Sequence, residues 1–94
     1  MVRILKSDVR KVGDKLKVNW DVVSIDTLHI GMKVEMEHGY INMRTNVTNN
    51  DLRKTALIAL AHIAEFPDYY VRLKRMEAQA DKYWKGRKRS DVFL

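Results

Sequence analysis

The hydrophobic positions between residues 52 and 84 recur at steps of three and four on both sides of the only proline in the chain. This spacing places them on one face of a helix. Proline suits the first turn of a helix and disfavours helix at the preceding residue. The pattern therefore predicts a helix that ends near Glu65 or Phe66, a sharp corner, and a helix from Pro67 to about Lys85, ended by Gly86. The apolar positions are Leu52, Ala56, Ala59, Leu60 and Ile63 in the first helix, and Tyr70, Leu73, Met76, Ala80 and Trp84 in the second.

Two further helices are predicted upstream. Val9, Val12 and Leu16 indicate a helix from Asp8 to about Leu16, capped by Ser7. A second helix is expected from Ser24 to His38, because Gly39 is a favourable residue just beyond a helix end. Gly31 lies inside this helix, where it would let a neighbouring element approach closely. The core positions of the second helix are Ile25, Leu28, Met32 and Met36.

The connecting segments complete an all-α prediction. Trp20, on the connector between the first two helices, is expected to pack into the core. Residues 39–50 form a long connection whose Ile41, Met43 and Val47 favour packing against the domain, and Thr48 or Asn50 is expected to cap the next helix. We therefore predict a compact single-domain bundle of about four helices with a long packed loop between helices two and three. Residues 1–86 form the helical domain, and residues 87–94 form a basic tail with an apolar tip.

Composition narrows the class of protein. Hydrophobic residues make up 46% of the chain and charged residues 32%, which is typical of a folded domain. Cysteine is absent, so disulfides and thiolate chemistry are excluded. We expect no signal peptide and no membrane span, hence a cytoplasmic protein or one carried within a virus particle, and not a secreted one. A core this small favours self-association or a protein partner.

The net charge of +6 is concentrated at the C-terminal end. Residues 1–70 hold ten Lys and Arg against nine Asp and Glu, whereas residues 71–90 hold eight against two. Cations interleaved with aromatic rings can hold nucleic acid through phosphate contacts and stacking. A solvated, disordered tail is the alternative and is the more common role of such a segment. The candidate nucleic-acid-binding residues are Lys82, Trp84, Lys85, Arg87, Lys88 and Arg89, with Tyr83 between them.

Acidic and histidine side chains form a second candidate site. Glu35 and His38 are three residues apart in the second helix, and His62 and Glu65 have the same spacing in the third, so each pair shares a helix face. If the two helices pack antiparallel, carboxylates and imidazoles would face one another, as in metal sites of helical bundles. We favour a structural network in which His62 bonds Glu35 or Glu37, over a metal site or acid–base catalysis. The candidate set is Glu35, Glu37, His38, His62, Glu65 and Asp68.

No catalytic motif accompanies these residues. The sequence has no glycine-rich phosphate loop, nucleophile elbow or HExxH motif, so we expect a protein that is not an enzyme and needs no cofactor. Adjacent aromatic residues usually place one ring in the core and one at its rim. We therefore expect Tyr70 in the core and Tyr69 beside it.

Several blocks of the chain occur in a characteristic order and spacing: VGDKL (12–16), NWD (19–21), GMKVEMEHG (31–39), TNVTN (45–49), ALAHIAE (59–65) and PDYY (67–70), followed by Leu73, Met76 and Glu77. In these blocks the chain resembles a small domain family of unknown function found in bacteria, phages and large DNA viruses. The resemblance extends from about Val12 to Trp84 and leaves out the basic end. It implies a compact helical fold and a frequent phage or viral setting, and it implies no mechanism.

The small core and the apolar tip of Val92, Phe93 and Leu94 favour a non-catalytic interaction or assembly module, such as a phage or viral structural or accessory protein. A nucleic-acid-associated protein and a metal-binding protein are the alternatives.

Overall fold

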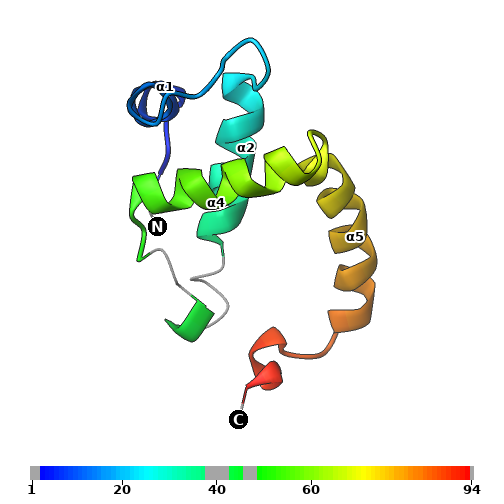
Figure 1. The fold of residues 1–94 in the computed structure, drawn as a ribbon. Coiled ribbons are helices and arrows are strands. Elements are labelled where there is room, and N and C mark those ends of the chain that lie inside the picture. The colour runs from blue at the N-terminus through cyan, green and yellow to red at the C-terminus, as the bar shows by residue number, and fades with distance from the viewer. Residues whose placement is uncertain (1–2, 38–42, 46–48, 94) are drawn as a thin grey trace.

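Four α-helices build the domain in the computed structural model, which describes residues 3–37, 43–45 and 49–93. No strand occurs in these ranges, and the all-α prediction is confirmed. Short 3-10 helices lie in the connection before α4 and after α5 (Figure 1). The elements are α1 (Lys6–Lys15), α2 (Ile25–Met36), η1 (Met43–Thr45), α4 (Leu52–Glu65), α5 (Tyr69–Trp84) and η2 (Arg89–Val92).

The N-terminal ends of α1 and α2 depend on local hydrogen bonds. The Asp8 carboxylate accepts a bond of 3.0 Å from the backbone N–H of Leu5, and α1 begins at Lys6. The prediction that Ser7 caps this helix is therefore wrong, since Ser7 lies in its first turn. The predicted start of α2 is confirmed, because the Ser24 hydroxyl accepts from the N–H of Thr27 at 3.0 Å.

The far end of α2 and the start of α4 differ from the prediction. The last residue of α2 is Met36 and its C-cap is Glu37, so the helix stops before His38, which lies outside the described residues. The cap of α4 is Asp51, whose carboxylate accepts from the N–H of Lys54 at 2.8 Å. Asn50 is not the cap, and Thr48 lies outside the described residues. Asn50 instead has a left-handed backbone with φ of 62°, a conformation that asparagine tolerates better than most residues.

The corner at Pro67 is present, although α5 begins two residues later than predicted. Phe66 has the extended backbone that a residue before proline prefers, and α4 ends at Glu65 as expected. Pro67 and Asp68 lie in a turn, in which the N–H of Tyr69 donates to the carbonyl of Phe66 at 2.9 Å. The fixed φ angle of Pro67 therefore stabilises the turn that precedes α5, and Pro67 does not lie in the first turn of the helix as predicted.

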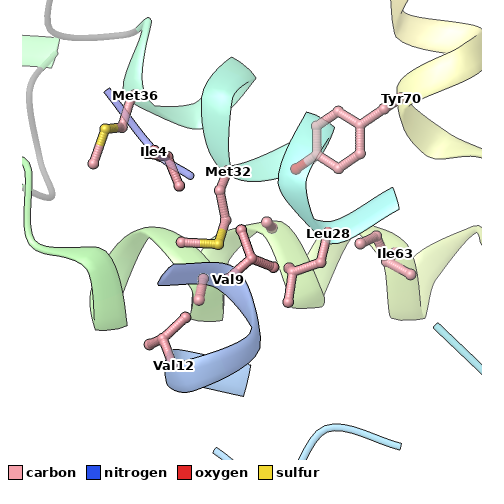
Figure 2. Close-up of a cluster of buried hydrophobic side chains, with 10 residues drawn as sticks. Ile4, Val9, Val12, Leu28, Met32, Met36, Ile63 and Tyr70 are labelled. Atoms are coloured by element: carbon pink, nitrogen blue, oxygen red, sulfur yellow. The ribbon is translucent and has the colours of Figure 1, made fainter. Parts of the chain in front are cut away.

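The core lies between α1, α2 and α4. Val9, Leu28, Met32, Ala56 and Ala59 have no solvent exposure. Figure 2 shows Tyr70 reaching from α5 toward α2, where it closes one side of this core. Burial of these apolar groups is the main source of the free energy of folding.

Two glycines allow aromatic rings to approach the helices closely; the approach at Gly31 was expected from the sequence, and the one at Gly13 was not. A Cβ atom at Gly31 would lie 2.6 Å from Cε2 of Tyr70, and one at Gly13 would overlap the Trp20 ring. Trp20 packs against the core, and its indole N–H donates to Asp14 at 2.8 Å. The contact between the Tyr70 ring and Gly31 is important for the candidate site, because it packs the start of α5 against the middle of α2.

The predicted apolar stripe of α5 is only partly a core face, which corrects the sequence interpretation. Tyr70 is buried and Leu73 packs against the core, whereas Met76 is 58% exposed. Figure 1 shows α5 leading away from the other helices toward the C-terminus. The radius of gyration of 14.2 Å exceeds the value of about 12 Å expected for a compact chain of this length. Among the described residues, none after Leu73 belongs to the hydrophobic core or packs against it, although Phe93, beyond the end of α5, lies under the guanidinium of Arg44 in η1 at 4.2 Å.

Candidate functional site

A buried carboxylate is the centre of the polar network. Glu35, on α2, is 3% exposed. The Tyr70 hydroxyl donates to Oε2 of Glu35 at 2.7 Å, and Nδ1 of His62 lies 3.0 Å from the same oxygen. The carboxylate therefore joins three helices, because Tyr70 comes from α5 and His62 from α4. A buried charge needs such partners, and removal of one is expected to cost more than the bond itself contributes.

Packing brings these three side chains together. In Figure 1, α4 runs across α2, which brings His62 to Glu35. Gly31 lies one helical turn before Glu35, and because it has no side chain, the Tyr70 ring can pack against α2 beside Glu35. Tyr69 stacks on the His62 imidazole with ring centroids 4.4 Å apart and planes 8° from parallel. One tyrosine thus holds the ring of His62 while the next one bonds Glu35. This matches the expected division between Tyr70 in the core and Tyr69 at its rim.

The protonation states follow from the geometry. Burial raises the pKa of the Tyr70 phenol far above its usual value near 10, and the Glu35 carboxylate raises it further. Tyr70 is therefore a permanent donor at neutral pH. The carboxylate is an acceptor, so Nδ1 of His62 carries the proton that faces it. The His62 side chain is 30% exposed, whereas that of Glu35 is 2% exposed, so the imidazole is the more solvent-accessible member of this pair.

Three other candidates of the acidic and histidine set, Glu37, Glu65 and Asp68, do not join Glu35 and His62. Glu37 and Glu65 are exposed at the ends of α2 and α4, and Asp68 pairs with Arg72 at 2.9 Å. His38 lies outside the described residues. In the part of the chain that the structure describes, no three His, Asp or Glu side chains lie close enough together to bind a metal ion.

Sequence analysis placed Tyr70 in the core and missed its role in the network. The signal for this role is chemical, because a buried tyrosine hydroxyl normally needs a hydrogen-bond partner. Its partner is 35 residues away along the chain, so no local pattern identifies Glu35 as that partner.

We expect His62→Ala to lower the free energy of unfolding by about 1–3 kcal/mol, because it removes a partner from the buried Glu35. Chemical denaturation of both proteins measures the change, and Ala61→Ser, at an exposed position of the same helix, is the control. Coincident unfolding curves would contradict a structural role for His62. A chelator that lowers the melting temperature of the wild type would instead indicate a bound metal.

Alkaline pH should unfold the protein partly through Tyr70. Its folded-state pKa lies above the unfolded value near 10, so its contribution to stability is complete below pH 10 and is lost as the pH rises above it. Stability measured from pH 7 to 12 should therefore fall above pH 10. Tyr70→Phe should flatten this decline, and an unchanged pH profile in the variant would contradict the assignment.

A second candidate surface lies along α5. Beside the corner at Pro67 there is an open groove of about 290 Å³. Arg72 borders it, with its guanidinium 3.9 Å from the Phe66 ring centroid. Met76, which lines the groove, and Tyr83, nearer the C-terminal end of the helix, are each 58% exposed. Together with Tyr69, Leu73 and Ala80 they form what we call the apolar strip of α5. The groove is lined by Glu65, Phe66, Tyr69, Arg72, Leu73 and Met76.

The basic end is partly folded against α5. Arg89 pairs with Asp81 at 2.6 Å, at the start of η2. Arg87 lies over the Tyr83 ring at 4.5 Å, and Arg89 lies 5.9 Å from the ring centroid of Trp84. Lys82, Lys85 and Lys88 are exposed, and among the described residues none of them forms an ion pair. The two arginines thus have intramolecular partners, whereas the three lysines point their charge into solvent.

The comparisons with known proteins identify one family. Residues 9–79 match the model of a family described as a protein of unknown function (DUF5661). Searches of curated proteins and of solved structures found no match.

Among the helices that the structure describes, none is both long enough and apolar enough to cross a membrane.

Proposed function

Because the chain belongs to the DUF5661 family, whose function is unknown, we propose that it is a non-catalytic assembly module that binds a protein partner through α5. The observation that carries the proposal is the apolar strip of α5. Beyond Leu73, this strip packs on no part of the described core. An amphipathic helix whose apolar face is uncovered is a common element of helix-mediated recognition.

The buried network supports this role indirectly. Tyr70, Glu35 and His62 fix the first turn of α5 to α2 and α4. The rest of α5 is therefore held at a fixed angle to α2 and α4, and Met76 and Tyr83 are exposed in a fixed orientation before any partner binds. Pre-organisation of this kind lowers the entropic cost of binding. The phage or viral setting belongs to the proposal as well, and the sequence resemblance is its support.

Site-specific photo-crosslinking tests the proposed surface. The photoreactive residue p-benzoylphenylalanine is placed at Met76 in one variant and at Ala78, an exposed position on the opposite side of the same helix, in the other. The full chain is irradiated in cells that naturally produce it. We expect protein adducts from the Met76 variant and few from the Ala78 variant. Equal yields from both positions, or no adduct from either, would overturn the proposal.

Nucleic-acid binding through the basic end is the second candidate function. The observation in its favour is the exposure of Lys82, Lys85 and Lys88 beside the Tyr83 ring. Such binding would be independent of sequence and would weaken steeply with salt. Deletion of residues 86–94 should leave helicity nearly unchanged while lowering the salt dependence by roughly one unit of slope per lost phosphate contact. Absence of binding at low salt would remove this candidate.

A further inference from the structure

The apolar strip of α5 has the spacing of a coiled-coil seam. Its members Tyr69, Leu73, Met76, Ala80 and Tyr83 follow one another at alternating steps of four and three residues. This mean spacing of 3.5 residues is that of the a and d positions through which two helices pack knobs into holes. Counting Leu73 and Ala80 as a positions makes Tyr69, Met76 and Tyr83 the d positions. A strip with this period fits a partner that is itself a helix.

The charged residues beside the seam indicate which helix could be the partner and in which orientation it would bind. In this frame Arg72 occupies a g position and Glu77 occupies the next e position, five residues later. In a parallel pair of helices these two positions face each other across the seam, and opposite charges there set partner choice and orientation. Two copies of α5 would thus form two identical ion pairs, Arg72 of each copy with Glu77 of the other.

An antiparallel pair lacks this complementarity. When the seam residues of two antiparallel copies overlap fully, the helices are centred near residue 76, and the two Glu77 side chains lie close to each other. Like charges in this arrangement oppose association. The basic residues Arg75 and Lys82 occupy positions that point away from the seam, so their mutual repulsion in the parallel pair is screened by salt.

We propose that α5 forms a parallel, two-helix seam with α5 of a second copy of this chain. The proposal rests on the proposed function, since it names the partner of the same surface. Arg72 can supply the pair because both of its contacts, the ion pair with Asp68 and the packing on the exposed Phe66 ring, lie at the surface and are easily exchanged. Tyr69 and Leu73 already pack in part against the core, so the part of the seam that is fully available to a second copy is Met76, Ala80 and Tyr83, about one heptad. So short a seam predicts a weak dimer that forms reversibly and whose population rises with protein concentration.

Charge reversal tests the orientation. Arg72→Glu alone and Glu77→Arg alone each place like charges opposite each other in a parallel homodimer, and each should weaken dimerisation by roughly tenfold in sedimentation equilibrium. An equal mixture of the two variants restores both attractive pairs, and we expect it to form a heterodimer at least as tight as the wild type. Arg75→Glu makes the same charge change on the outer side of α5 and is the control, with little effect expected.

Each other result overturns the inference. A wild type that stays monomeric at all concentrations excludes the second copy as partner. Dimerisation that is unaffected by Glu77→Arg, but abolished by Met76→Lys, indicates an antiparallel seam. Failure of the mixture to recover the dimer shows that the single variants act through damage to the fold.

The crosslinking experiment and the sedimentation experiment together distinguish failure of this inference from failure of the proposed function. Adducts between Met76 and other proteins, with a monomeric wild type, would retain an α5 assembly surface and reject self-association. Absence of any adduct, together with a monomeric wild type, would reject both.

Discussion

Tyr70→Ala is expected to lower the free energy of unfolding by about 3–5 kcal/mol. The ring is 7% exposed and lies against Gly31 of α2. Its removal leaves a cavity, and Glu35 also loses the donor at 2.7 Å. Tyr70→Phe keeps the ring and removes only the hydroxyl, so it should cost about 1–3 kcal/mol. The two variants separate the packing contribution from the hydrogen-bond contribution.

Tyr83→Ala is the matched control, because it is the same substitution on the same helix at a side chain that is 58% exposed. At protein concentrations low enough to keep the chain monomeric, it should change the free energy of unfolding by less than about 0.5 kcal/mol. Urea denaturation followed by circular dichroism measures all three variants. Equal losses for Tyr70→Ala and Tyr83→Ala would show that α5 is not anchored through its first turn.

Local chemistry explains which features of the fold were predictable. The corner at Pro67 follows from the angles that proline imposes on itself and on Phe66, so the end of α4 at Glu65 was predicted correctly. The cap of α4 was not, since any of the short polar residues before it can accept the required hydrogen bond. The left-handed backbone at Asn49 and Asn50 places Asp51 at that position, and nothing in the residue types alone selects it.

Periodicity shows that α5 has an apolar face but not what covers this face. Tyr70 and Met76 belong to the same predicted stripe, yet one is buried and the other is 58% exposed. The difference arises at the Pro67 corner, which sends α5 away from α4 after a single turn of contact (Figure 1). Such a difference depends on the direction that α5 takes after the turn at Pro67. The spacing of hydrophobic residues contains no information about this direction.

The same reasoning applies to the polar network. Six acidic and histidine residues had suitable types and spacings, and the structure brings together Glu35 and His62. The antiparallel pairing that would join both Glu-x-x-His segments requires helices that run alongside each other. Because α4 crosses α2, the helix ends that carry Glu37 and Glu65 do not face each other, and both side chains lie in solvent. The other side-chain partner of Glu35 is Tyr70, from the next helix.

Gly31→Ala should lower the free energy of unfolding by about 1–3 kcal/mol, although alanine is the better helix former. In a helix interior, replacement of glycine by alanine normally stabilises by roughly 0.5–1 kcal/mol. At Gly31 the added methyl group would lie 2.6 Å from the Tyr70 ring and 3.2 Å from Cβ of Ala59. The ring has little freedom to move, because its hydroxyl is bonded to the buried Glu35. Overpacking therefore outweighs the gain in helix propensity.

A double-mutant cycle identifies the cause of this cost. In the Tyr70→Ala background the ring is gone, so Gly31→Ala should be nearly neutral or stabilising, which gives a coupling energy of about 1–3 kcal/mol. The four proteins are compared by urea denaturation in trimethylamine N-oxide, which keeps the weakened variants folded. Additive effects would mean that the clash is not with Tyr70, and that α5 does not rest on α2 at Gly31. A large coupling would establish the contact that fixes the direction of α5, on which the presentation of Met76 and Tyr83 depends.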